Sequence, residues 1–248
     1  MVSREVIGVE ALIRWQHPQQ GLLLPGAFLP MIEGSHLEIA AGEWVISTAL
    51  TQVASWQRIG LDLPISVNIS AGHLLAPSFA RRLKQLLIQH PECDPGCLEM
   101  EVLETSALSD IVQASQTLTA CRELGVRFAL DDFGTGYASL AYFRKLPIDV
   151  LKIDQSFVRD MLDDPNDMEI VESVVRLAHA FQRTVVAEGV ETPEHGALLT
   201  PLGCRLGQGF GIARPMPANA IPDWTLIWPE QGNSMVVDRG RRPGHSSG

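Results

Sequence analysis

Short apolar segments alternate with longer amphipathic segments along most of this 248-residue chain. This alternation is typical of βα units built on a parallel sheet. The expected strands lie at 5–12, 63–69, 97–103, 126–131, 148–153, 183–188 and 203–208. The expected helices lie at 37–59, 75–89, 107–124, 166–181 and 194–201, with short helices near 26–33, 137–144 and 155–161. A closed parallel (β/α)8 barrel needs eight strands, and we expect the missing one to lie upstream.

The formal net charge of −10 argues against a partner that is a nucleic-acid polymer, because such binding requires a basic surface. No apolar stretch reaches the roughly 18–20 residues that span a bilayer, and no signal-peptide pattern opens the chain. We therefore expect a cytoplasmic chain without membrane contact, or the cytoplasmic part of a larger, membrane-anchored protein. Residues 1–228 are expected to form one domain, and 229–248 a disordered tail.

Two adjacent carboxylates, Asp131 and Asp132, end the apolar run at 126–130, and a loop with two glycines follows. Neighbouring ionised carboxylates repel each other. A hard divalent cation, which prefers oxygen ligands, would relieve that repulsion. An aspartate that caps the start of a helix is the alternative explanation for the same residues.

Polar residues also end the other expected strands, where barrels of this class carry their chemistry. They are Glu10 with Leu12 and Arg14 on the same face, Asn68, Glu101 and Glu104, Lys152 and Asp154, Glu188 and Glu191, and Gln208. A charged group in an apolar strand is costly unless it is paired or ligated, and one lysine cannot pair with so many acids. A site for divalent metal, with two ions that share Asp131, explains the pattern better than structural ion pairs.

The same residues carry a resemblance to a known family. Glu10-Ala11-Leu12 in the context EALIRW, followed by His17-Pro18, resembles the motif that names the EAL domains, which are phosphodiesterases of the bacterial second messenger cyclic di-GMP. The resemblance continues through Asn68-Ile69-Ser70, Asp131-Asp132-Phe133-Gly134-Thr135-Gly136, Lys152-Ile153-Asp154, Ala187-Glu188-Gly189-Val190-Glu191 and Gln208-Gly209. It covers about residues 7–222. It implies an α/β, TIM-like (β/α)8 barrel of EAL type, here without the usual antiparallel first strand at the N-terminus.

The resemblance also implies roles for individual residues. Two ions of Mg²⁺ or Mn²⁺ would be held by two overlapping sets, Glu10, Asn68, Glu101 and Asp131 for the first and Asp131, Asp132 and Glu188 for the second. Lys152 and Glu188 would position and deprotonate the attacking water. The substrate would be contacted by Leu12, Arg14, Asp154 and Glu191, with Arg14 on a phosphate. Gln208 would support metal-bound water, and Glu104 would anchor the loop 132–140.

The implied reaction is metal-dependent hydrolysis of cyclic di-GMP to linear pGpG by in-line attack on one phosphodiester. Leu103 replaces the hydroxyl residue that the family usually has there, and we expect activity to be retained. The alternatives are a catalytically inactive cyclic di-GMP receptor and an interaction module. Degenerate family members lose the first glutamate, the paired aspartates or the lysine, whereas this chain has all of them. The expected partners besides cyclic di-GMP are a second copy of the chain and an upstream diguanylate-cyclase-like or sensory domain.

Overall fold

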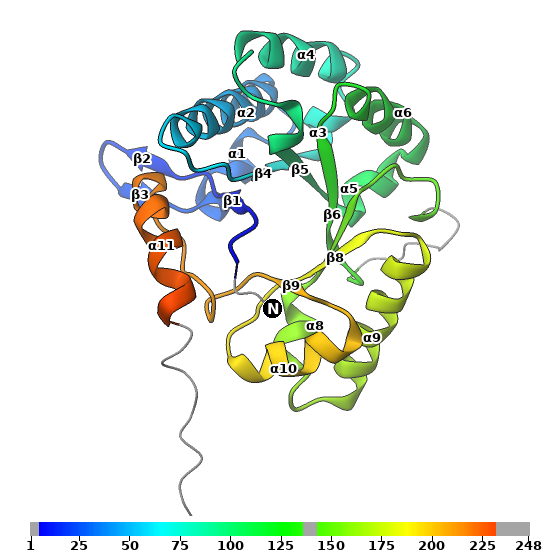
Figure 1. Cartoon of the computed structure of the whole chain (residues 1–248). Coiled ribbons are helices and arrows are strands. Elements are labelled where there is room, and N and C mark those ends of the chain that lie inside the picture. The colour runs from blue at the N-terminus through cyan, green and yellow to red at the C-terminus, as the bar shows by residue number, and fades with distance from the viewer. Residues whose placement is uncertain (1–4, 136–142, 232–248) are drawn as a thin grey trace, which may run out of the picture.

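A curled parallel sheet lies at the centre of the computed structural model, which describes residues 5–135 and 143–231. The sheet has seven strands in the order β1-β4-β5-β6-β7-β8-β9. They are β1 (Val9–Ala11), β4 (Ile65–Ile69), β5 (Leu98–Leu103), β6 (Arg127–Phe133), β7 (Val150–Ile153), β8 (Thr184–Ala187) and β9 (Leu206–Gly207). With helices around its outer side (Figure 1), the sheet has the arrangement of a TIM-like α/β fold. The fold class predicted from the sequence is confirmed.

Most of the described helices follow strands of the sheet in sequence, as βα units require. They are α1 (Leu29–Ile32), α2 (His36–Gln57), α3 (Ala71–Leu74), α4 (Phe79–Gln89), α5 (Glu104–Ser109), α6 (Ile111–Arg122), α8 (Gln155–Asp160), α9 (Pro165–Ala180), α10 (Pro193–Leu202) and α11 (Ile221–Gln231). Short 3-10 helices lie at η1 (Pro25–Ala27), η2 (Pro95–Cys97) and η3 (Ala218–Ala220). None of the helices in the described ranges is long and apolar enough to cross a membrane.

The central strands β5, β6 and β7 are buried on both faces, which is why their sequences are nearly continuous apolar runs. The outer strands β1 and β9 are only partly buried. Phe128, Leu130, Met100 and Leu151 are almost completely buried in the core between sheet and helices. Because both faces of the central strands are covered, polar side chains can reach solvent at the ends of the strands. A functional site is therefore expected at the rim of the sheet, where the strands end.

Two of the predicted helices differ in the structure, and local chemistry explains each difference. The predicted helix 75–89 begins only at Phe79, as α4, because Pro77 lacks the N–H that a continuous helix would use, and the short helix α3 lies before the predicted range. The predicted helix 107–124 is divided into α5 and α6 at Asp110, whose side chain accepts a hydrogen bond from the backbone of Gln113 at 3.0 Å. The predicted helix 26–33 is a 3-10 turn followed by α1.

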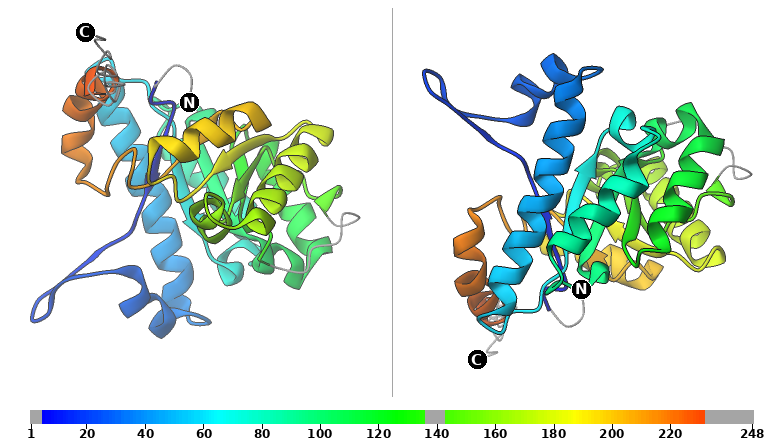
Figure 2. Two further views of the ribbon diagram at one scale, coloured as in Figure 1. Left: turned by 90° about the horizontal axis from the view of Figure 1, so that it is seen from below. Right: turned by 90° about the horizontal axis from the view of Figure 1, so that it is seen from above.

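Besides the short helices α3, η2 and η3, the sequence reasoning missed a hairpin and a C-terminal helix. An antiparallel hairpin of β2 (Trp15–His17) and β3 (Gly21–Leu23) extends away from the barrel (Figure 2). Helix α11 continues to Gln231, so residues 229–231, which were predicted to belong to the tail, are helical. Residues 232–248 of that predicted tail and 137–142 of a predicted short helix lie outside the described residues.

Candidate functional site

Lys152 on β7 is the centre of a buried charged cluster. Its Nζ atom lies 2.7 Å from Glu101 Oε2, 2.7 Å from Glu188 Oε1 and 3.1 Å from Asp131 Oδ1. Glu10 Oε2 is further away, at 4.0 Å. These acids come from β1, β5, β6 and the residue after β8, and the parallel sheet brings them together at one rim.

Two side-chain amides hold Glu10 in place. Asn68 Nδ2 on β4 donates to Glu10 Oε1 at 2.6 Å, and Gln208 Nε2 donates to Glu10 Oε2 at 2.6 Å. Glu10 belongs to β1 and Gln208 directly follows β9, and these are the first and last strands of the sheet order. The Gln208–Glu10 bond therefore links the two ends of the curled sheet through side chains.

A second group of acids overlaps the first. Oxygen atoms of Asp131, Asp132 and Glu188 all lie within 4.8 Å of one another. Asp131 Oδ1 is buried and has no hydrogen-bond partner in the described part of the chain, although Lys152 is close enough for an ion pair. Asp131 is thus shared between the two groups and has an oxygen available for a ligand.

The residues present fit a divalent metal ion. Four carboxylates face the single ammonium of Lys152, so most of their negative charge is not balanced by that contact. Carboxylate and amide oxygens are the ligands that hard cations such as Mg²⁺ prefer. An acidic group of this composition could bind a metal ion, which would offset the cost of burying so many like charges.

The pKa values within the cluster reflect the same imbalance. Burial, opposed by Lys152, raises the pKa of Glu101 to about 8 and that of Glu188 to about 7. Burial and the charge of Asp131 raise the pKa of Asp132 to about 6. Burial by itself would lower the pKa of Lys152, but the surrounding carboxylates outweigh it and raise that pKa, so the lysine stays charged at neutral pH.

Without metal, the protein is expected to lose stability as the pH rises from 6.5 to 8. Glu101 and Glu188 have raised pKa values when folded, so the folded state binds more protons than the unfolded state in this range, and the free energy of unfolding falls with pH. Buried His73, whose pKa is lowered from 6.5, acts in the opposite direction, but its effect fades as the pH rises above 6.5 because the unfolded histidine then also loses its proton. Thermal unfolding at several pH values measures the slope.

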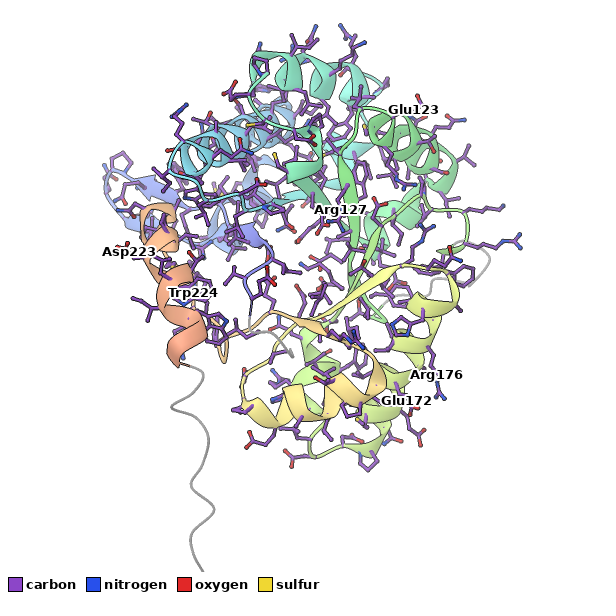
Figure 3. The ribbon with its side chains drawn as sticks, viewed as in Figure 1. Glu123, Arg127, Glu172, Arg176, Asp223 and Trp224 are labelled. Carbon is purple, nitrogen blue, oxygen red and sulfur yellow. The ribbon has the colours of Figure 1, made fainter. Side chains whose placement is uncertain are left out.

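Mg²⁺ is expected to reverse this dependence, because ligation requires deprotonated carboxylates and grows stronger as the pH rises. The Mg²⁺-induced increase in Tm should be larger at pH 8 than at pH 6.5. Glu101→Gln should flatten the slope of the metal-free protein, whereas Glu172→Gln on the outer side of α9 (Figure 3) should leave it unchanged. A metal-free stability that rose over this range would contradict the prediction.

Asp132 has an unusual backbone conformation that directs its carboxylate. Its φ of 53° lies in the left-handed region, which aspartate tolerates better than most residues. Its side chain shares a hydrogen bond with Asp154, and Asp154 accepts bonds from the backbone and hydroxyl of Ser156 at the start of α8. Burial would raise the pKa of Asp154, but the bonds from Ser156 outweigh it and lower the pKa. Asp154 therefore connects Asp132 to α8.

Glu104 directly follows β5, as predicted, and begins α5, and it is buried. Its Oε2 accepts a hydrogen bond from the backbone N–H of Gly134 at 3.0 Å. This contact joins α5 to the segment that follows Asp131 and Asp132. Glu104 thus holds the described start of that loop, while residues 136–140 of the loop lie outside the described ranges.

A cavity of about 260 Å³ opens beside the cluster. Its lining residues come from several strand ends and are Glu10, Asp131, Gln155, Glu188, Gly189, Glu191, Gln208, Gly209 and Phe210. Leu12 and Arg14 are not among these described lining residues: Leu12 is partly exposed, and Arg14 donates to the carbonyl of Ile13 at 2.8 Å. The structure therefore brings together most of the predicted site residues and leaves these two outside the cavity.

Sequence reasoning missed Gln155 and Phe210, which line the cavity without being acidic. Gln155 directly follows Asp154, and Phe210 follows the pair Gln208-Gly209, so their position next to site residues was the available signal. Gly189 was predicted only as part of the motif at 187–191, without a role of its own. Its φ is 71°, and a Cβ there would lie 2.8 Å from Gln155 Cβ, so only glycine lets the two segments approach.

Comparisons with known proteins identify one family. The family model described as "EAL domain" matches residues 1–215. Over 217 residues, 87% of this chain, the sequence is 41% identical to the bifunctional diguanylate cyclase/cyclic di-GMP phosphodiesterase MucR of Pseudomonas aeruginosa, of which it covers 32%. It is 40% identical to the cyclic di-GMP phosphodiesterase PdeR of Escherichia coli over 220 residues, which is 89% of this chain and 33% of PdeR.

Solved structures agree with the sequence comparison. The MucR phosphodiesterase in complex with cyclic di-GMP superposes with a TM-score of 0.82 at 41% identity, and the match covers 87% of each chain. The chain spans about a third of the length of the curated relatives it matches. The match therefore concerns one part of each relative and not the activity of the whole protein.

Proposed function

Because this chain belongs to the EAL domain family, we propose that it hydrolyses cyclic di-GMP to linear pGpG. The observation that carries the proposal is the cluster around Lys152, in which four carboxylates from separate strands meet one ammonium beside an open cavity. The relatives named as cyclic di-GMP phosphodiesterases, and the MucR structure with that ligand, support the choice of substrate.

The proposed cofactor is Mg²⁺ or Mn²⁺, with two ions in the site. One would be held by Glu10, Asn68, Glu101 and Asp131, and the other by Asp131, Asp132 and Glu188. When bound, such ions stabilise charge on phosphoryl oxygens and make water a nucleophile at neutral pH. The proximity of Asp131, Asp132 and Glu188, the Asn68–Glu10 hydrogen bond, and the buried Asp131 Oδ1 that has no hydrogen-bond partner among the described residues support this assignment.

For the remaining residues we propose the roles that the resemblance to the family implies. Glu188 lines the cavity 2.7 Å from Lys152, so it would take a proton from the attacking water while Lys152 provides a fixed positive charge. Gln208 would hold Glu10 through its side-chain hydrogen bond and would support metal-bound water. Asp154 and Glu191 would orient the nucleotide, and Leu12 and Arg14 would contact it from outside the described cavity walls.

Incubation of the purified protein with cyclic di-GMP and Mg²⁺ or Mn²⁺ is expected to yield pGpG, and chromatography of the products measures it. A chelator should abolish the reaction, and added metal should restore it. A folded sample that formed no pGpG with either metal would overturn the proposal. Tight binding without product would instead favour the receptor function.

Two further properties remain predictions. MucR is named as a bifunctional enzyme, which supports an upstream diguanylate-cyclase-like or sensory domain linked to this chain. We also predict a homodimer, which sedimentation of the purified chain would detect.

A further inference from the structure

The segment 12–32 differs from the rest of the chain in charge and in exposure. It contains no acidic residue, although the chain has 29 of them, and Arg14 is its only charged side chain at pH 7. Its exposed large apolar residues are Leu12, Trp15, Leu22, Leu24, Leu29 and Met31. Depletion of charge together with accessible aromatic and Met side chains is typical of the centre of a protein interface.

The hairpin of β2 and β3 lies within this segment and projects from the barrel (Figure 2). Trp15 pairs with Leu23 across the hairpin, so these two side chains share one face. Phe28, which is buried, packs on this face, with its ring centre 5.7 Å from that of Trp15. This contact anchors the hairpin to the rest of the chain.

The opposite face of the hairpin is open to solvent. Leu22 and Leu24 are two residues apart in extended backbone, so they point to the same side. Their exposed fractions are 62% and 60%. Among the described strands β3 pairs with β2 alone, which leaves the outer edge of β3 open as well. An unpaired edge beside apolar side chains is a template for another strand.

A second copy of the chain fits this surface better than an anionic membrane does. Two chains of net charge −10 repel each other through acidic surfaces, and a segment without acids lets them approach. The same net charge, with Arg14 as the only cation of the segment, opposes attachment to anionic lipid. The exposed apolar residues offer roughly 600 Å² in each copy, or about 1,200 Å² for two copies, which reaches the size of specific interfaces.

We propose that two copies of the chain associate through this surface, with β3 antiparallel to β3 of the second copy across a two-fold axis at Leu23. In that register Leu22 of each copy lies opposite Leu24 of the other on the open face. Pro25 ends the pairing, because it has no N–H to donate. This inference rests on the homodimer predicted above, to which it assigns an interface, and is independent of the proposed hydrolysis.

Sedimentation equilibrium tests both the surface and the register. The unmodified chain is expected to form dimers. Leu22→Lys should weaken the dimer by about 100-fold, because it places an unpaired charge opposite Leu24. Addition of Leu24→Glu to Leu22→Lys should restore the dimer to within about tenfold, because each introduced lysine then faces an introduced glutamate of the other copy. Both positions are exposed, so the variants should remain folded, which circular dichroism checks.

The matched control is Ile88→Lys on α4, since Ile88 is 66% exposed and lies outside the segment. It should leave the dimer unchanged. A monomeric unmodified chain would overturn both the predicted homodimer and this inference. A Leu22→Lys dimer as tight as that of the unmodified chain would overturn the inference alone and place the interface on another face, and so would a failure of the second substitution to restore the dimer.

A membrane is the competing occupant of this surface. Flotation with vesicles of phosphatidylcholine, alone or mixed with phosphatidylglycerol, should leave the unmodified chain in the unbound fraction. Flotation that Leu22→Lys abolished would assign the surface to lipid and overturn the inference. Initial rates of cyclic di-GMP hydrolysis on the same samples test the proposed function separately, since the hairpin residues are not among the described residues that line the cavity.

Discussion

Glu188→Gln is expected to lower kcat for cyclic di-GMP hydrolysis by about 100- to 10,000-fold, the range typical for loss of a general base. Glutamine keeps the size of the side chain but cannot accept the proton of the attacking water. Its carbonyl oxygen can still approach Lys152, whose Nζ lies 2.7 Å from Glu188 Oε1. Binding of cyclic di-GMP should therefore persist, and initial rates together with calorimetry measure the two effects.

The control is Glu172→Gln, the same change on an exposed face of α9, where Glu172 pairs with Arg176 at 3.3 Å (Figure 3). This variant should turn over cyclic di-GMP like the unmodified protein. Near-normal turnover by Glu188→Gln would remove Glu188 from the role of base. Loss of both binding and the Mg²⁺-induced Tm shift would show instead that Glu188 acts mainly as a metal ligand.

Lys152→Met is expected to abolish turnover and to destabilise the metal-free protein by about 3–5 kcal/mol at pH 8, as removal of one partner from a buried ion pair usually does. Lys152 is almost fully buried, and its removal leaves Glu101, Glu188 and Asp131 facing one another without a cation. The loss should be smaller at pH 6.5, because Glu101 and Glu188, whose pKa values are about 8 and about 7, can then accept protons.

Addition of Mg²⁺ should distinguish the contribution of Lys152 to stability from its contribution to turnover. Mg²⁺ should restore much of the stability of Lys152→Met, since the acids then have a competing cation, but turnover should stay lost because the ammonium beside the water is absent. Denaturant unfolding with and without Mg²⁺ measures the first effect, and initial rates measure the second. Lys84→Met on α4 is the control, as Lys84 is exposed and should affect neither. Full turnover by Lys152→Met would exclude the lysine from the reaction.

The central strands could be predicted because their apolar runs are buried on both faces, so each run is visible without knowledge of its neighbours. The late start of α4 after Pro77 and the helix break at Asp110 depend on one residue each, and periodicity over a longer window conceals such local effects. The β2–β3 hairpin was missed because its strands are three residues long, too short for alternation to be recognised. Helix α11 was missed because its apolar residues adjoin a polar tail that obscures its end.

The sequence alone determined which acids, amides and lysine are available, and the ordered motifs determined the family, because residue identity and order require no coordinates. Only the tertiary structure decided that Lys152 contacts four carboxylates at once and that Gln208 reaches Glu10 across the two ends of the sheet. It also decided that Phe210 and Gln155 lie in the same cavity. These relations join residues far apart in the chain, and they depend on the register and curvature of the sheet, which no local pattern records.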